Sequence, residues 1–284
     1  MPYLAAMIDR ETIFVTFDTE TTGLSAAEGR IVEIAALKYD LTGRIIGRFA
    51  ELVNPMQPIP PGAMAVHHIT DDMVAGSLPM AEILPRFIDF IAGDNVVLIA
   101  QNALFDIGFV NHEAIRCEFA LPLRTIFDQI ELTKRVFPGL STYSLEPTCR
   151  IFGLVETQEH RAMGDAVLVM KLFFHCLNKL ADWPQRLNIL NNLFRYSFGG
   201  PMQAAVDAAT LEVIVGALES GRILEIIYAG GSMRGKPRRI IPTLMFNRDG
   251  IEYIVADCLV SKTSKQFRLD RILACRAVEN DPEA

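Results

Sequence analysis

The sequence has little that would mark a secreted, zinc-binding or membrane-spanning protein. Its five cysteines lie far apart, without a Cys-x-x-Cys pair or a nearby Cys/His cluster, so neither a zinc site nor a disulfide framework is expected. The first residues lack a basic stretch followed by an apolar one, and no apolar run is long enough to span a bilayer. These absences predict a cytoplasmic protein with reduced thiols and no signal peptide.

The sequence also lacks a broadly positive charge. Its net charge is −7 over 284 residues; the residues before Leu211 carry −8, and those from Leu211 onward carry +1. Half of the residues are hydrophobic, which is enough for one large domain or two smaller ones. A nucleic acid could still bind such an acidic protein, because bound divalent ions reverse the local electrostatic field. We therefore expect nucleic acid to bind at a metal site and at separate basic patches.

The segment Ile13–Leu24, which reads IFVTFDTETTGL, combines an apolar run with two acids. Ile13–Phe17 is typical of a buried strand. Asp18 and Glu20 follow two residues apart, so on an extended chain their carboxylates point to the same side. Such a pair repels itself unless it holds a cation such as Mg²⁺. The alternative is a polar strand end that runs into a loop.

The rest of the first 180 residues alternates short apolar runs with helical patterns, which predicts an α/β fold. The expected strands are Arg30–Asp40, Arg44–Val53 and Val96–Ala100, and the expected helices are Pro79–Ala92, Tyr143–Phe152 and Ala162–Leu180, with a strand and a helix also within Arg124–Arg135. The first strand and the next two should form an antiparallel meander. Val96–Ala100 should be a buried strand parallel to the first.

Two further acids occur at the starts of expected helices. Asn102 could cap a helix that carries Asp106 one turn in. Asp165 lies in the first turn of the helix that begins at Ala162, and His160 lies in the loop before it. Taken singly, Asp106 is better explained as an acid that complements the helix dipole, and His160 and Asp165 as surface residues.

The remaining chain is expected to form a linker and a small β-rich module. Residues 181–207 are interpreted as a linker with one helix, in which Trp183 packs between domains. A helix, Ala208–Leu218, should precede the strands Leu224–Ala229, Arg239–Phe246, Ile251–Cys258 and Gln266–Leu269. The expected domains are therefore residues 1–180, the helical linker 181–207, and residues 208–284.

Three short motifs, taken together, resemble those of a known enzyme family. FDTETTGL, NALFD and HRAMGDA closely resemble, in this order, the motifs of the DEDDh 3′-to-5′ exonucleases, which include the proofreading subunit of bacterial replicative polymerases. VHHIT is similar to the VHGIT that often lies between the first two motifs. The resemblance covers Thr12 to Leu180 and implies a ribonuclease H-like fold, a mixed sheet flanked by helices.

The resemblance also implies roles for individual residues. The expected ligands of two divalent ions, Mg²⁺ or Mn²⁺, are Asp18, Glu20, Asp106 and Asp165, with His160 as general base. The residues expected to contact the terminal nucleotide are Thr21, Leu24, His67 and Asn102. Two departures concern substrate fit and leave the metal ligands in place: Gln101 stands where many relatives have His, and His68 replaces the Gly of VHGIT.

The carboxyl-terminal module has a resemblance of its own. LESGRILEIIYAG, RRIIP, IEYIVADC and FRLDRI look like a WYL domain, a small Sm-like or SH3-like β-barrel that binds nucleic acid or nucleotides, over Leu211 to Val278. The residues that this resemblance implicates in ligand binding are Tyr228, Arg239, Tyr253, Arg268 and Arg271. The alternatives are that Arg234–Arg239 is a solvated loop, that Tyr253 is a core residue, and that Arg271 pairs with an acid such as Asp270.

The sequence therefore favours a metal-dependent 3′-to-5′ exonuclease that acts on single-stranded 3′ ends, preferably of DNA, with a second module that binds nucleic acid or regulates the enzyme. One alternative is an exoribonuclease that trims RNA 3′ ends. Another is a non-catalytic nucleic-acid-binding regulator, although the chain has neither a missing acid nor a helix-turn-helix. The small barrel could also serve only self-association.

Overall fold

The computed structural model of the chain describes residues 8–26, 28–122, 124–155, 160–180, 190, 195–198, 206–231, 233–248 and 251–278. Two compact units are present. The first contains Met1–Gly23, Arg30–Asp106 and Arg124–Tyr196, and the second contains Leu24–Gly29, Ile107–Leu123 and Ser197–Ala284. Trp183 and most of the expected linker lie outside the described residues.

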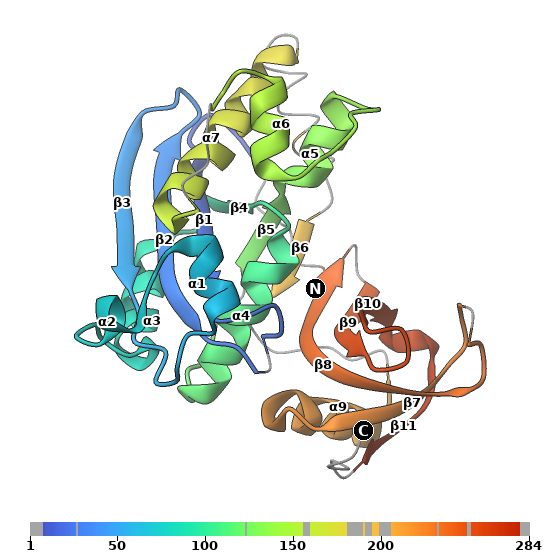
Figure 1. The fold of residues 1–284 in the computed structure, drawn as a ribbon. Helices are drawn as coiled ribbons and strands as arrows, with labels where there is room; N and C mark the ends of the chain where they lie inside the picture. Colours follow the sequence, from blue (N-terminus) through green and yellow to red (C-terminus); the bar gives the residue numbers. More distant parts are fainter. Residues whose placement is uncertain are drawn as a thin grey trace. The chain divides into compact units, whose positions relative to one another are not determined.

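A mixed sheet forms the centre of the first unit (Figure 1). Its strands are β1 (Ile13–Thr21), β2 (Ile31–Asp40), β3 (Ile45–Leu52), β4 (Val96–Ala100) and β5 (Arg124–Asp128), in the order β5-β4-β1-β2-β3. β1, β2 and β3 are antiparallel neighbours, and β4 is parallel to both β1 and β5. The predicted meander and the predicted parallel strand are confirmed.

Helices cover both faces of this sheet. The helices of the first unit are α1 (Pro61–His67), α2 (Asp71–Val74), α3 (Met80–Phe90), the first turn of α4 (Ala103–Arg116), α5 (Gln129–Val136), α6 (Leu145–Ile151) and α7 (Ala162–Lys179). α5, α6 and α7 pack on the face that contains Phe14, where Phe173 of α7 lies 5.0 Å from the Phe14 ring. α3 packs on the opposite face, where Phe87 lies 5.7 Å from Phe17.

The alternation of side chains along β1 decides which face of the sheet Asp18 and Glu20 occupy. Residues two apart share a face of a strand, so Asp18 and Glu20 lie on the same face as Phe14, the face covered by α7. The strand carries both acids at its carboxyl end, as the sequence predicted. It continues through both acids to Thr21, because this part of β1 still pairs with β2, where Glu20 lies opposite Glu33.

The second unit contains an antiparallel β-domain preceded by a helix. Its elements are α9 (Ala208–Ser220), β7 (Ile223–Tyr228), β8 (Pro237–Arg248), β9 (Ile251–Cys258), β10 (Thr263–Arg268), a 3₁₀ turn (Leu269–Arg271) and β11 (Ile272–Val278). β8 pairs with β7 and β9, β9 with β10, and β7 with β11, all antiparallel. Ile214 of α9 packs on a core that includes Ile226 and Phe267.

Two of the strands in the described residues, β6 and β11, were not predicted. β11 escaped detection because most of its residues are at least partly exposed, so its sequence lacks a clean alternation of apolar and polar residues. β6 (Arg195–Phe198) lies in the segment interpreted as a linker. The alternative that Arg234–Arg239 is a solvated loop does not hold for the whole segment, because β8 begins at Pro237 and Arg238 is buried. In the part of the chain that the structure describes, no helix is long and apolar enough to cross a membrane.

Candidate active site

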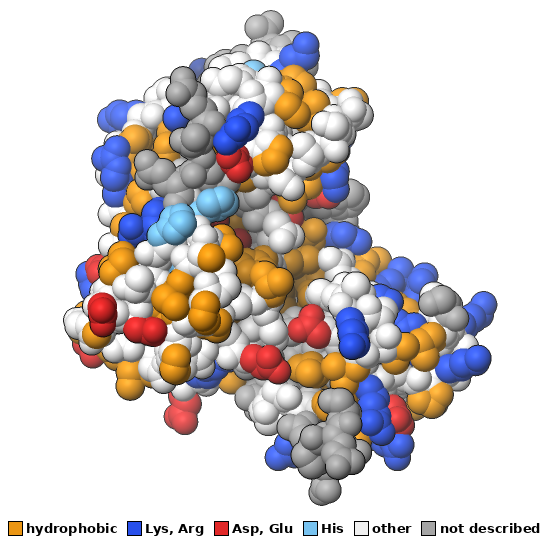
Figure 2. All heavy atoms as spheres, viewed as in Figure 1, with side chains coloured by type: hydrophobic (Ala, Val, Ile, Leu, Met, Phe, Trp, Pro, Cys, Tyr) orange, Lys and Arg blue, Asp and Glu red, His pale blue; other side chains and the backbone are white. Residues whose placement is uncertain are grey.

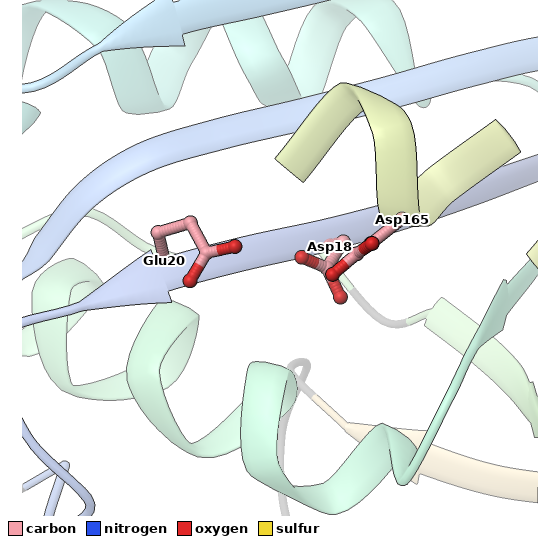
Figure 3. Close-up of side chains that lie close together, drawn as sticks. All are labelled: Asp18, Glu20 and Asp165. Carbon is pink, nitrogen blue, oxygen red and sulfur yellow. The ribbon is translucent and has the colours of Figure 1, made fainter. Parts of the chain in front are cut away.

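Three carboxylates from two distant parts of the chain meet beside β1. Asp18 and Glu20 lie on β1, and Asp165 lies in the first turn of α7. One oxygen of each carboxylate lies within 4.8 Å of an oxygen of the other two (Figure 3). Oxygen ligands at this spacing suit a hard divalent cation. We call Asp18, Glu20 and Asp165 the acidic cluster.

Asp106 lies beside the acidic cluster but is not one of the three acids that converge most closely. It is 2% exposed, in the first turn of α4. Its Oδ1 accepts hydrogen bonds from the backbone N–H of Thr19 at 3.0 Å and from the Thr19 hydroxyl at 2.8 Å. Thr19 thus ties α4 to β1 between the two strand acids and fixes the position of Asp106.

Burial and neighbouring charges make it unfavourable to ionise Asp18, Glu20 and Asp106 when no cation is bound. Burial, followed by the charges of Asp106, Asp165 and Glu20, raises the pKa of Asp18 well above its ordinary value. Burial, followed by the charges of Asp165 and Glu33, raises the pKa of Glu20 to about 8, and the charge of Arg161 opposes this rise. Burial raises the pKa of Asp106 to about 7, against the hydrogen bonds from Thr19. Carboxylates that resist ionisation together are the donor set expected of a divalent metal site.

His160 immediately precedes the helix that carries Asp165. It is half-buried and has a positive φ of 49°, in the left-handed region that is costly for a residue other than glycine. The next residue, Arg161, is the N-cap of α7. The imidazole therefore belongs to a segment whose backbone is fixed at its carboxyl-terminal end by the start of the helix.

Glu33, which the sequence interpretation did not single out, anchors that start. Its carboxylate accepts hydrogen bonds from Arg161 Nε at 3.0 Å, from Arg161 Nη2 at 2.5 Å and from the Ala162 N–H at 2.8 Å. One feature of the sequence could have identified Glu33: it is an acid inside the apolar run of β2, and a buried carboxylate needs hydrogen-bond or charge partners.

The residues expected to contact the terminal nucleotide differ in exposure. Leu24 is 90% exposed, and Asn102 is exposed with a φ of 55°. Thr21 is buried and donates its hydroxyl hydrogen to Gly23 O at 2.7 Å. His67 is 2% exposed, and its Nδ1 accepts from the Ile69 N–H at 3.0 Å.

The two departures from the related motifs have local explanations. His68 caps the carboxyl end of α1 with a φ of 61°, the left-handed conformation that Gly adopts most easily. This accounts for the Gly found at this position in the related motif. Gln101 donates its side-chain N–H to Tyr143 O at 2.7 Å, which links the end of β4 to the loop before α6.

Several WYL ligand candidates already have partners in the second unit. The Arg268 guanidinium pairs with Asp270 at 2.6 Å, and Arg239 with Glu225 at 3.9 Å. Tyr253 is 9% exposed and stacks on Phe246. The two other candidates lie near a glycine turn: the Tyr228 hydroxyl accepts from the Arg268 N–H at 3.1 Å, and Arg271 is exposed.

Comparisons with known proteins agree with this arrangement. Residues 15–173 match the family model described as Exonuclease (RNase_T), and residues 209–277 match the WYL domain. DNA polymerase III subunit epsilon of Treponema pallidum (strain Nichols) is 41% identical over 168 residues, which cover 58% of this chain and 77% of the relative. The PolC-type DNA polymerase III of Oceanobacillus iheyensis is 34% identical over 172 residues, which cover 61% of this chain but only 12% of that protein.

The fold is also found among solved structures. The zinc-bound E. coli exonuclease I complex with single-stranded DNA superposes with a TM-score of 0.58 at 17% identity, and the match covers 86% of this chain and 54% of that one. The expected ribonuclease H-like fold, followed by an antiparallel β-domain, is confirmed. The chain belongs to the DEDD-type exonuclease family that includes the epsilon subunit of DNA polymerase III, and it combines a 3′-to-5′ exonuclease domain with a WYL domain.

Proposed function

We propose that this exonuclease releases nucleotides one at a time from single-stranded 3′ ends of DNA, with two divalent ions, Mg²⁺ or Mn²⁺, held by Asp18, Glu20, Asp106 and Asp165. The convergence of Asp18, Glu20 and Asp165 within 4.8 Å is the observation that carries the proposal. When bound, such ions polarise a phosphoryl oxygen and offset the charge that develops as the phosphodiester breaks.

The four acids contribute in two ways. Asp18, Glu20 and Asp165 supply closely spaced oxygens on the face of β1 that α7 covers. Asp106 is held by Thr19 through one oxygen, so its Oδ2 is the atom that we assign to a metal. All four carboxylates are needed, since loss of one oxygen ligand changes both the charge and the geometry of the site.

His160 is assigned as the general base. One of its imidazole nitrogens accepts the proton of the attacking water while negative charge builds on the phosphate. Imidazole suits this role because its ordinary pKa lies close to neutral pH. Its position immediately before α7 supports the assignment, because the same helix start carries Asp165.

Binding of the terminal nucleotide is assigned to Thr21, Leu24, His67 and Asn102. Leu24 is a large apolar side chain left 90% exposed, as expected if it packs against the last base. The preference for DNA is supported by the 41% identity to an epsilon subunit of DNA polymerase III. Exoribonuclease activity is the second candidate, since contacts to the 2′ position decide between the two substrates.

The other proposals concern organisation and location. We assign residues 1–180 to the exonuclease domain, 181–207 to a helical linker and 208–284 to the WYL domain, in a cytoplasmic protein. The WYL domain would bind nucleic acid through Tyr228, Arg239, Tyr253, Arg268 and Arg271. Figure 2 shows Lys and Arg side chains over the region of β7 to β11, in agreement with the positive net charge of the sequence after Leu211.

Degradation of matched oligonucleotides tests the proposal. Labelled DNA and RNA of one sequence, single- and double-stranded, would be incubated with the full chain and Mg²⁺ or Mn²⁺. Asp18→Ala and Asp165→Ala should abolish hydrolysis while oligonucleotide binding persists, and Asp94→Ala, at an exposed acid outside the cluster, should hydrolyse normally. Hydrolysis at the unchanged rate in Asp18→Ala contradicts the proposal. Binding without metal-dependent hydrolysis by the unaltered chain supports the non-catalytic alternative.

A further inference from the structure

Asp128 lies where strand β5 ends and helix α5 begins. It is the last residue of β5 and the N-cap of α5, and its Oδ1 accepts a hydrogen bond from the Ile130 N–H at 2.9 Å. An N-cap acid normally satisfies the backbone donors of its own helix. Asp128 is 8% exposed, so its carboxylate is not directly available to a substrate. The cap of α5 accounts for only one of the hydrogen bonds that this carboxylate accepts.

The other hydrogen bonds come from the residues that follow the neighbouring strand. Asp128 is paired with Ala100, the last residue of the parallel strand β4 (Figure 1). Its Oδ1 also accepts from the Asn102 N–H at 3.2 Å, and its Oδ2 accepts from the Ala103 N–H at 3.2 Å. Ala103 is the first residue of α4. One carboxylate therefore joins the starts of two helices, α4 and α5.

Asp128 has backbone donors in place of a cation. Among the described residues, no Lys or Arg forms an ion pair with it. A buried carboxylate needs compensation, which here comes from the N–H groups at two helix starts. Hydrogen bonds to an ionised acceptor are stronger than those between neutral groups. The backbone that leads from β4 into α4 is therefore held firmly by Asp128.

Asn102 is the exposed residue in this held segment. Its φ of 55° lies in the left-handed region, which Asn tolerates better than most residues. Such a conformation persists where the surrounding structure holds it. The Asn102 side chain is exposed and, in the part of the chain that the structure describes, makes no hydrogen bond. The direction of this side chain is therefore set by its backbone, and the backbone is fixed by Asp128.

We propose that Asp128 is a positioning residue that acts on DNA binding through Asn102. It holds the left-handed backbone of Asn102, so that the exposed amide is directed at the terminal nucleotide before the strand binds. An amide carries both a hydrogen-bond donor and an acceptor, so its direction decides which groups it contacts. This inference rests on the contact between Asn102 and the terminal nucleotide that the proposed function assigns.

The metal ligand on the same helix has a separate anchor. Asp106 lies one turn further along α4, and its Oδ1 accepts two hydrogen bonds from Thr19 on β1. Loss of the Asp128 contacts should therefore act on Asn102 and leave Asp106 in place. We expect the loss to raise KM for DNA and to spare kcat, whereas general damage to the active site would lower kcat.

Three substitutions separate the contacts of Asp128. Asp128→Ser keeps an N-cap for α5, because its hydroxyl can accept from the Ile130 N–H, but it lacks the oxygens that accept from Asn102 and Ala103. Asp128→Asn keeps one acceptor oxygen of the two and should retain part of the function. Asn102→Gly removes the side chain that is positioned and leaves the left-handed conformation accessible.

Kinetics of the full chain on single-stranded DNA test the inference. Burial raises the pKa of Asp128 to about 6, so assays at pH 8 keep its carboxylate ionised. At saturating Mg²⁺, Asp128→Ser should raise KM about tenfold and keep kcat within about twofold, with Asp128→Asn in between. In a chain that already carries Asn102→Gly, Asp128→Ser should raise KM no further, because the side chain that it positions is absent.

Binding in EDTA repeats this double-mutant cycle without hydrolysis. The affinity of a labelled single-stranded oligonucleotide, measured by fluorescence anisotropy, should show the same pattern. This separates failure of the inference from failure of the proposed function, since a chain that binds but does not hydrolyse DNA still completes the cycle. Asp207→Ser is the matched control: Asp207 is an exposed N-cap of α9 that accepts from the Thr210 N–H at 2.9 Å, and its replacement should change neither KM nor affinity.

Several results would overturn the inference. They are an unchanged KM and affinity in Asp128→Ser, a fall in kcat without a rise in KM, and an equal effect of Asp128→Ser with and without Asn102→Gly. If Asn102→Gly alone changes neither KM nor affinity, the inference fails together with the assigned nucleotide contact, while the metal ligands remain supported by the loss of hydrolysis in Asp18→Ala. Urea unfolding shows which variants fold, and if Asp128→Ser does not, Asp128→Asn takes its place in the cycle.

Discussion

Replacement of Glu33 by Ala tests how the fold positions the active site. The Glu33 side chain is 7% exposed, and it accepts hydrogen bonds from Arg161 Nε at 3.0 Å, from Arg161 Nη2 at 2.5 Å and from the Ala162 N–H at 2.8 Å. Arg161 and Ala162 lie between His160 and Asp165. Glu33→Ala therefore releases the start of α7 from β2 without altering any proposed metal ligand.

The loss of stability in Glu33→Ala can be worked out from the two groups that donate to Glu33, the Ala162 N–H and the Arg161 guanidinium. Ala162 is fully buried, so its N–H would be left without an acceptor, at a cost of about 1–3 kcal/mol. The Arg161 side chain is 38% exposed and regains water, so loss of the ion pair adds only about 1 kcal/mol. These losses add up to about 2–4 kcal/mol in the free energy of unfolding. Part of this loss is offset in EDTA, because Glu33→Ala also removes a charge that raises the pKa of Glu20 and of Asp18.

Urea unfolding in EDTA would measure this loss, with Glu51→Ala as control. Glu51 pairs with Arg86, and their side chains are 31% and 52% exposed, so its replacement should cost less than about 1 kcal/mol. At saturating metal and DNA, Glu33→Ala should also lower the single-turnover rate. Glu33→Gln should keep more of both, because its amide oxygen still accepts from Ala162. A loss in Glu33→Ala no greater than in Glu51→Ala would refute the reasoning.

Four further predictions follow from the site and the core. Burial and like charges raise the pKa of Glu20 to about 8, and burial raises the pKa of Asp106 to about 7. Between the ordinary pKa values of these acids and the raised ones, the folded protein therefore binds more protons than the unfolded chain. The free energy of unfolding in EDTA should therefore fall as pH rises from about 5 to about 8, and Mg²⁺ should reduce this fall. A urea midpoint in EDTA that does not change over this pH range would contradict the prediction. Asp165→Asn should abolish hydrolysis yet raise the metal-free urea midpoint, because it removes a charge that raises the pKa of Glu20. Phe173→Ala should cost about 3–5 kcal/mol in urea unfolding, since Phe173 is 1% exposed. His68→Gly should raise the free energy of unfolding by at most about 1 kcal/mol, whereas His68→Val should lower it, because of the left-handed φ of 61°.

Much of the fold could be predicted because local patterns specify it. The apolar run of β4 and the helical spacing in α7 give their type and approximate bounds directly. The order of motifs gave the acids that meet beside β1, since each acid follows or begins a recognisable element. Where a strand carries polar residues, the local pattern is weaker. Asp18 and Glu20 were expected at the carboxyl end of the first strand, and β1 does carry both, but the pairing of its last residues with β2 is a tertiary contact that the local pattern does not specify.

The role of Glu33 could not be read from the sequence for a related reason. Its partner Arg161 lies 128 residues away, and no periodicity connects the two. The burial of Arg238 was equally hidden. In the sequence it belongs to a run of cations with glycine and proline, and only the pairing of β8 with β7 and β9 turns it inward while its neighbour Arg239 faces water.

The contrast between Glu33 and the strand acids opposite it separates a structural carboxylate from a proposed metal ligand. Glu33 on β2 lies opposite Glu20 of the acidic cluster on β1, and its charge contributes to the raised pKa of Glu20. Glu33 has its own cation, Arg161, and a backbone donor. Among the described residues, Asp18 and Glu20 form no ion pair with Lys or Arg, and their pKa values are raised by burial and by neighbouring acids. Glu33 is thus compensated by its own partners, whereas Asp18 and Glu20 keep raised pKa values even though Arg161 partly offsets that of Glu20, which is why a cation from solution is expected at these two acids and not at Glu33.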